Sequence, residues 1–153
     1  VTAMYRRSAL LKIPFRKISY SEDAIWAKDA VMNGYAIVYN HNARVFHYHL
    51  EDADFTFKRS FTTMYFRYRQ FGFLYETPVF TFRSKLGMLK LLVSTFGADI
   101  KGIKQWYGYN IQSFKAVQKA HQLFLTTLQE GEKALDTKHA ELCGNPPIPL
   151  KAR

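Results

Sequence analysis

The chain has 153 residues, of which 48% are hydrophobic and 16% aromatic, and its formal net charge is +10. This composition is too rich in apolar side chains for a disordered tail, and the length predicts one folded domain with a core of its own. The single cysteine, Cys143, excludes an internal disulfide framework and a cysteine-based zinc site. Because charged residues interrupt every long apolar run, we expect no membrane-spanning helix.

Basic residues are concentrated in the middle of the chain. Residues 1–54 carry seven basic and six acidic side chains, residues 55–120 carry eleven and two, and residues 121–153 carry four and four. The cations of the middle region alternate with Phe, Tyr, Leu and Met, which indicates an anionic partner. An anionic membrane surface and nucleic acid are the two candidates. No recognised nucleic-acid motif accompanies the pattern, so we expect no nucleic-acid partner.

Two short helices are expected near the N-terminus. Residues 5–11 suit the first. Ser21 is placed to cap the second, with two acidic residues in its first turn, where the helix dipole favours negative charge. Asn33 and Gly34 form a typical helix stop.

Two extended segments should follow these helices. Residues 35–40 (YAIVYN) and 43–49 (ARVFHYH) are rich in β-branched and aromatic side chains. The order helix, turn, strand, strand predicts an α/β arrangement for residues 1–54.

The rest of the chain shows the helical period. Apolar side chains recur at three- and four-residue steps over residues 57–75, 83–96 and 100–135, which predicts amphipathic helices. The apolar stripe expected for the second of these helices consists of Leu86, Leu89, Val93 and Phe96. We therefore divide the chain into residues 1–54, a helical region 55–140 and a Pro-rich tail 141–153.

Two pairs of side chains near the start of the chain could carry chemistry. Glu22 and Asp23 are adjacent, so on a helix they diverge by about 100° and only one of them can face a given site. A surface charge pair at a helix start is the alternative interpretation. His47 and His49 would lie on one side of a strand and could ligate a divalent metal, although a lone His-x-His also arises by chance.

A set of short motifs occurs in a defined order. The motifs are Met4-Tyr5-Arg6-Arg7, Pro14-Phe15, Glu22-Asp23 with Trp26, Gly34-Tyr35 with Val38-Tyr39, and Val45-Phe46-His47-Tyr48-His49. The set resembles the C-terminal half of a family 2 glycosyltransferase of the GT-A fold, of the bacterial rhamnosyltransferase-like group, over about residues 3 to 75. The resemblance implies an α/β fold, a partial GT-A domain whose nucleotide-binding half would lie upstream of Val1, followed by a mainly α-helical C-terminal region.

The resemblance also implies an activity and a site. Such enzymes move a sugar, with inversion, from a nucleotide-sugar donor to a hydroxyl of a saccharide or lipid-linked acceptor, in bacterial cell-surface polysaccharide synthesis. Asp23, beside Glu22, would be the general base, a role typically worth about 100-fold to 10,000-fold in rate. Mg or Mn would neutralise the leaving diphosphate, with His47 or His49 completing its coordination. Trp26 could stack on the acceptor sugar or could instead pack beneath the helix.

The donor-binding residues would then lie outside this sequence, so we expect the isolated chain to be inactive. We also expect a cytoplasmic protein that is peripheral at the inner face of the membrane. The predicted membrane-binding residues are Lys58, Arg59, Arg67, Arg69, Arg83, Lys85 and Lys90. The alternative is a non-catalytic basic helical module that binds a membrane or another partner. The two interpretations differ at Asp23, which should face a cleft near His47 in the enzyme and solvent in the module.

Overall fold

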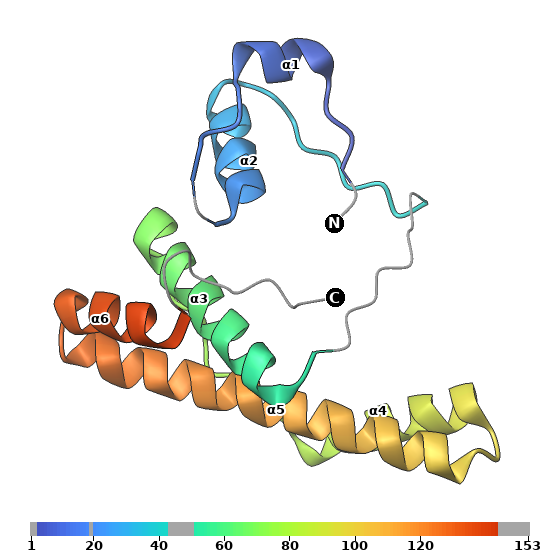
Figure 1. The fold of residues 1–153 in the computed structure, drawn as a ribbon. Coiled ribbons are helices and arrows are strands. Elements are labelled where there is room, and N and C mark those ends of the chain that lie inside the picture. The colour runs from blue at the N-terminus through green and yellow to red at the C-terminus, as the bar shows by residue number, and fades with distance from the viewer. Residues whose placement is uncertain (1–2, 19, 43–50, 144–153) are drawn as a thin grey trace. The chain divides into compact units, whose positions relative to one another are not determined.

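A computed structural model describes residues 3–18, 20–42 and 51–143 (Figure 1). These residues form six helices and no strand, and 70% of them are helical. The chain divides into two compact units, Val1–Leu50 and Glu51–Arg153. The described part of the chain is therefore mainly α-helical.

The predicted α/β class, a partial GT-A domain, is wrong. Residues 35–40, expected to form a strand, have no regular secondary structure, and Ile37, Val38 and Tyr39 are exposed. β-Branched and aromatic residues favour a strand only where a neighbouring strand pairs with the backbone and packs against the side chains. No described segment supplies that neighbour. The second predicted strand, residues 43–49, lies outside the described residues.

The first unit contains two short helices, α1 (Arg7–Lys12) and α2 (Glu22–Met32). Small residues and one large aromatic residue bring them together. The buried core consists of Ala9, Ile13, Trp26 and Ala30. The Trp26 indole Nε1 donates a hydrogen bond to the Ile13 carbonyl oxygen at 2.6 Å, so the polar atom of this buried ring is satisfied.

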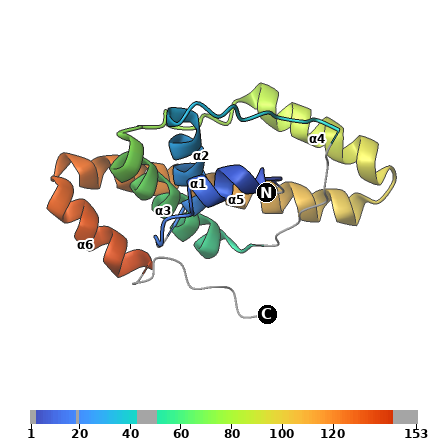
Figure 2. The same ribbon diagram turned by 90° about the horizontal axis from the view of Figure 1, so that it is seen from above.

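The second unit is a helical assembly built on one long helix. Its elements are α3 (Ala53–Phe71), α4 (Phe82–Phe96), α5 (Ile100–Gln129) and α6 (Glu132–Cys143). α4 folds back along the first part of α5 as a hairpin, whereas α3 and α6 pack against the second part and against each other (Figures 1 and 2). The buried core of this second part consists of Phe61, Met64, Ala120, Phe124 and Leu135.

Side chains that accept hydrogen bonds from the first turn set the starts of three of these helices. Asp52 accepts from Phe55 N at 2.7 Å in α3, Thr81 from Ser84 N at 3.1 Å in α4, and Asp99 from Gly102 N at 2.9 Å in α5. Each acceptor satisfies an N–H group that has no partner within its helix. The caps of α4 and α5 agree with the helix starts that the hydrophobic period indicates, whereas the Asp52 cap starts α3 four residues earlier than expected.

Two predicted helices differ from the sequence-based expectation. The helix predicted over 57–75 spans Ala53–Phe71, four residues earlier at both ends. The helix predicted over 100–135 ends at Gln129, and α6 begins three residues later at Glu132. Gly131 lies between them with a φ of 111°, a backbone conformation that L side chains rarely adopt. The apolar period continues through this break because α5 and α6 both face the same core. Periodicity alone therefore did not reveal the turn.

Candidate functional site

The predicted acidic pair lies in the first turn of α2. Both Glu22 and Asp23 are exposed. The Asp23 carboxylate accepts a hydrogen bond from the Ala24 backbone N–H at 2.7 Å, and within the described ranges no cation pairs with it. The preceding Ser21 occupies the capping position in the left-handed region, with a φ of 58°, and its side chain makes no capping hydrogen bond. The helix start thus presents its carboxylates to solvent, where the helix dipole stabilises their charge.

Trp26 packs beneath this helix start. Its ring meets Tyr5 edge-on with centroids 4.9 Å apart and stacks on Phe15 at 5.7 Å. The indole is buried, and its N–H is bonded to a backbone carbonyl. These contacts favour the packing role over stacking on an acceptor sugar. They also bring residues of three of the sequence motifs, Tyr5, Phe15 and Trp26, into one aromatic cluster.

The predicted metal ligands, His47 and His49, lie outside the described residues. Residues 3–18, 20–42 and 51–143 contain no group of three or more His, Cys, Asp or Glu side chains arranged to hold a metal ion. The assignment of Mg or Mn to His47 or His49 therefore stays a prediction.

Most of the predicted membrane-binding cations on α3 have carboxylate partners. The ion pairs, with their nitrogen–oxygen distances, are Lys58–Asp54 (2.7 Å), Arg59–Glu51, Arg69–Glu132 (2.6 Å) and Arg69–Asp136 (2.7 Å). The guanidinium carbon of Arg67 lies 5.0 Å from the centre of the Tyr75 ring. The pKa of Lys58 is raised because its ammonium group donates a hydrogen bond to Asp54 and is attracted by the negative charge of that carboxylate. The charge of α3 is thus largely balanced within the second unit.

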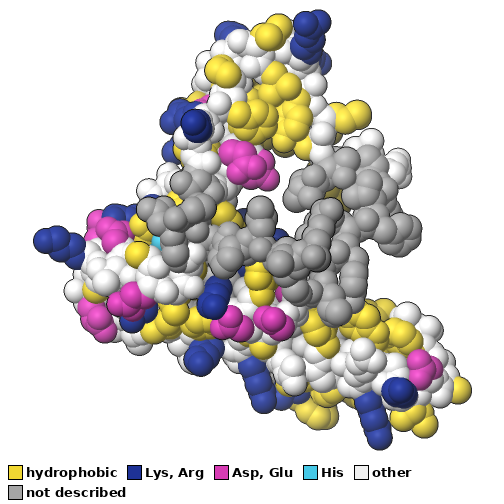
Figure 3. Space-filling view, viewed as in Figure 1, with side chains coloured by type: hydrophobic (Ala, Val, Ile, Leu, Met, Phe, Trp, Pro, Cys, Tyr) yellow, Lys and Arg dark blue, Asp and Glu magenta, His cyan; other side chains and the backbone are white. Residues whose placement is uncertain are grey.

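The three predicted membrane-binding cations on α4 have no carboxylate partners among the described residues. Within the part of the chain that the structure describes, Arg83, Lys85 and Lys90 form no ion pair, and α4 contains no acidic residue. The Lys85 Nζ atom lies 6.0 Å from the centre of the Phe80 ring. Figure 3 shows hydrophobic side chains at the surface of the hairpin formed by α4 and the start of α5, with basic side chains along its edge. None of the described helices has the length and apolarity needed to cross a membrane.

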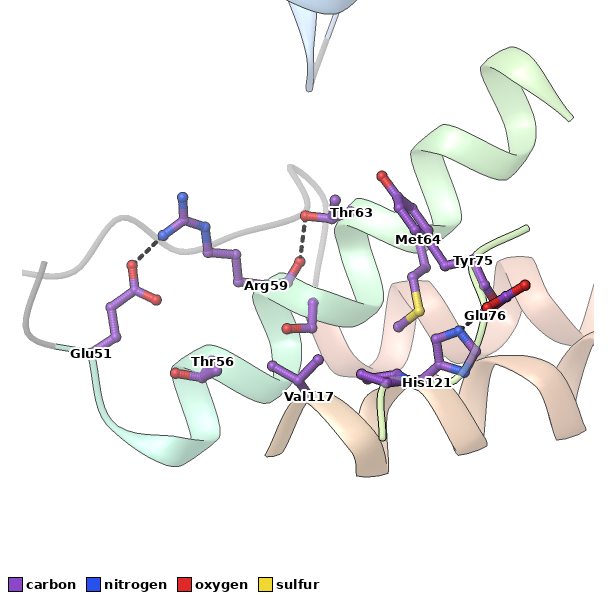
Figure 4. A pocket seen from close by; sticks show the side chains of 11 residues that line it. Glu51, Thr56, Arg59, Thr63, Met64, Tyr75, Glu76, Val117 and His121 are labelled. Carbon is purple, nitrogen blue, oxygen red and sulfur yellow. Dashed lines mark hydrogen bonds and ion pairs between the residues drawn. The ribbon is translucent and has the colours of Figure 1, made fainter. Parts of the chain in front are cut away.

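The second unit also contains a pocket of about 460 Å³ beside α3 (Figure 4). Its walls come from α3, the segment before α4, and α5. The lining residues are Glu51, Thr56, Arg59, Ser60, Thr63, Met64, Tyr75, Glu76, Pro78, Val117 and His121. Figure 4 shows the Glu51–Arg59 pair at one end of the pocket and His121 beside Tyr75 at the other.

Hydrogen bonds to His121 fix the tautomer of its neutral ring. Nε2 donates to the Tyr75 carbonyl oxygen at 2.7 Å, and in the neutral ring Nδ1 then accepts from the Thr77 hydroxyl at 3.1 Å. Burial lowers the pKa of His121. Both ring nitrogens are occupied, so this histidine anchors residues 75–77 to α5 and is not free to accept a substrate proton.

Sequence reasoning missed part of the exposed surface of α4. It placed Phe96 on the apolar stripe, but Phe96 is half-buried and Phe82 takes the outer position. The spacing of Phe82 to Leu86 is four residues and could have revealed this.

Comparison with protein-family models, with curated proteins and with solved structures gives no significant match.

Proposed function

We propose that the chain is part of an inverting glycosyltransferase in which Asp23 is the general base. One observation supports this proposal above the others. The aromatic cluster of Tyr5, Phe15 and Trp26 joins motifs that are separate in the sequence, and Trp26 lies in the same helix as Asp23, three residues further on. A general base has to be held in position by packed neighbours, and this cluster packs the helix that carries Asp23.

The proposed reaction uses the carboxylate only for proton transfer. Asp23 takes the proton of an acceptor hydroxyl while that oxygen forms a bond to the anomeric carbon of the donor sugar. The bond from the anomeric carbon to the nucleoside diphosphate breaks on the opposite face, and its electron pair leaves with the diphosphate. Attack opposite to the leaving group inverts the configuration.

Substitution of the base tests the proposal directly. In the full-length protein encoded by the gene, Asp23→Asn should lower sugar transfer by about 100-fold to 10,000-fold, the range typical of a general base. The measurement is release of nucleoside diphosphate from a panel of nucleotide sugars with a saccharide acceptor. Glu130→Gln is the matched control, since Glu130 is an exposed carboxylate in the turn after α5. Transfer by Asp23→Asn at the control rate would remove the base assignment.

A second candidate function is a non-catalytic basic module that binds a surface or a partner. Two observations favour it: Asp23 is exposed, and α4 carries cations without ion-pair partners beside exposed apolar side chains. On this proposal the intact protein releases no diphosphate from any nucleotide sugar, whereas its partner binding persists in Asp23→Asn. Sugar transfer that depends on Asp23 would show that partner binding is not the whole function of the protein.

A further inference from the structure

We propose that α4 binds the surface of an anionic phospholipid bilayer, lying in the plane of the membrane with one apolar stripe turned toward the acyl chains. The α4 stripe consists of Phe82, Leu86, Leu89 and Val93. The proposal does not depend on sugar transfer, and it gives the second candidate function a specific partner.

The four residues of the α4 stripe form a continuous exposed surface. Their spacings of four, three and four residues keep them within about 60° of one another around a helix that turns 100° per residue. The side chains of Phe82, Leu86, Leu89 and Val93 are 80%, 55%, 38% and 48% exposed. Apolar side chains that gather on one helix face and stay in water mark an interaction surface.

A different face of α4 provides the packing within the second unit. Leu92 is 9% exposed, and Met88 and Phe96 are half-buried. The hairpin with α5 is closed further by Phe80, which stacks on Phe114 with ring centroids 4.4 Å apart. The stripe lies to one side of this buried face. Docking of α4 on α5 therefore leaves the stripe exposed.

Cations flank the stripe on both sides. By the same helical geometry, Arg83 and Lys90 lie about 80–100° from Phe82 in one direction, and Lys85 lies about 60° away in the other. Long basic side chains at such positions bury their stems against the apolar surface and extend their charges outward. An amphipathic helix of this kind inserts its apolar face at the headgroup boundary while its cations meet anionic headgroups.

The charge around α4 distinguishes a bilayer from other occupants. Residues 79–104 carry five basic side chains and one acidic side chain, Asp99, which is engaged as the cap of α5. A second copy of the chain, pairing symmetrically through the stripe, would bring the same cations together at the cost of like-charge repulsion. Nucleic acid would satisfy the cations and leave Leu86, Leu89 and Val93 of the stripe in water. An anionic lipid surface satisfies both the cations and the stripe.

Vesicle binding tests the proposal with the full chain. Sedimentation is measured with vesicles of phosphatidylcholine alone and of phosphatidylcholine mixed with phosphatidylglycerol. We expect binding to the mixed vesicles only, and we expect it to weaken as salt rises from about 0.1 M to 1 M, because the screening length falls from about 10 Å to 3 Å. Equal binding to both vesicles, or indifference to salt, would overturn the proposal.

Matched variants locate the surface. Replacing Arg83, Lys85 and Lys90 together by Gln should lower the partition coefficient by about 100-fold, the effect of three cations near an anionic surface. Replacing Lys115, Lys133 and Lys138 by Gln removes the same charge from elsewhere and should change binding far less. Both variants must keep the wild-type circular dichroism spectrum. Equal losses in the two variants would overturn the assignment to α4.

Two more variants separate the apolar contribution and the catalytic proposal. Leu86→Ser with Leu89→Ser should weaken binding without altering charge. A dimer that depends on these leucines, or nucleic-acid binding that depends on the α4 cations, in place of vesicle binding would contradict the proposal. Asp23→Asn should bind vesicles as the wild type does. Since vesicle binding needs no sugar donor, failure of lipid binding and failure of sugar transfer are recorded separately.

Discussion

At the scale of single residues, His139 is a buried titratable group enclosed by aromatic rings. Its ring stacks on Tyr65 with centroids 4.0 Å apart and meets the edge of Phe66 at 5.5 Å. The side chain is buried, and Nε2 has no hydrogen-bond partner among the described residues. Burial lowers the pKa of His139, an effect that the negative charge of Asp136 partly offsets. The folded protein therefore holds His139 neutral.

This arrangement predicts a pH-dependent stability. The unfolded chain binds a proton at each histidine near pH 6.5, whereas the folded state resists protonation of His139 and His121. Because the unfolded state binds more protons, the free energy of unfolding should fall as pH drops from about 7 to 5. The pKa of Asp136 is lowered in the folded state, so the stability that its charge contributes is lost only as pH falls below about 4.

Urea unfolding of His139→Phe at several pH values checks this expectation. The phenyl ring preserves the stacking on Tyr65 but cannot be protonated, so its stability should depend less steeply on pH between 7 and 5. Part of the pH dependence of the free energy of unfolding should remain, because His121 is unchanged in this variant. Parallel pH profiles for the wild type and His139→Phe would show that His139 is not the titrating group.

At the scale of elements, α6 is held on the rest of the second unit by its buried residues Leu135, His139 and Cys143 and by a polar cluster. Leu135 is fully buried in the core with Phe61 and Phe124. The Tyr65 hydroxyl donates a hydrogen bond to Asp136 Oδ1 at 2.8 Å, and the Arg69 guanidinium donates to the same oxygen at 2.8 Å. Isolated short helices are marginal in water, so α6 depends on these contacts for its helical state.

Truncating Leu135 tests that dependence. Leu135→Ala should lower the free energy of unfolding by about 2–5 kcal/mol, the usual cost of such a truncation in a core. Lys133→Ala, on the exposed side of α6, is the control and should change stability by less than about 0.5 kcal/mol. Thermal and urea unfolding give both values. Equal, small losses would mean that α6 contributes little to the core.

The helices were predictable from sequence because their determinants are local. The apolar period indicated α3, α4 and most of α5, and cap residues such as Thr81 and Asp99 stand at their starts. The error at residues 35–40 has a different origin. Side-chain shape there favours a strand, but a strand exists only when another segment pairs with it. The candidate base, Asp23, was found from its motif, whereas the support under it depends on contacts that the sequence pattern does not show.

At the scale of the whole molecule, the two units differ in the size of their cores. Among the described residues, the core of the first unit consists of two alanines, Ile13 and Trp26, whereas the core of the second consists of one alanine and four larger side chains, Phe61, Met64, Phe124 and Leu135. Small units bury a smaller fraction of their surface and are correspondingly less stable. Each unit contains one tryptophan, Trp26 in the first and Trp106 in the second.

These tryptophans allow the stability of the units to be measured separately. In Trp106→Phe, fluorescence reports only the surroundings of Trp26, while far-ultraviolet circular dichroism is dominated by the helices of the second unit. We expect the fluorescence transition in urea to occur at lower denaturant than the circular dichroism transition. Coincident transitions would show that the units unfold as one cooperative body.

The sequence by itself indicated which regions of this protein are helical and where its excess positive charge lies, although the bounds of α3 and the turn between α5 and α6 differ from the expectation. Caps, glycine conformations and charge are properties of neighbouring residues, and they do not depend on the rest of the fold. Only the tertiary structure decided which face of α4 is buried and that residues 35–40 adopt no regular secondary structure. Those outcomes depend on surfaces supplied by distant segments, such as α5 for Leu92, and no local pattern specifies them.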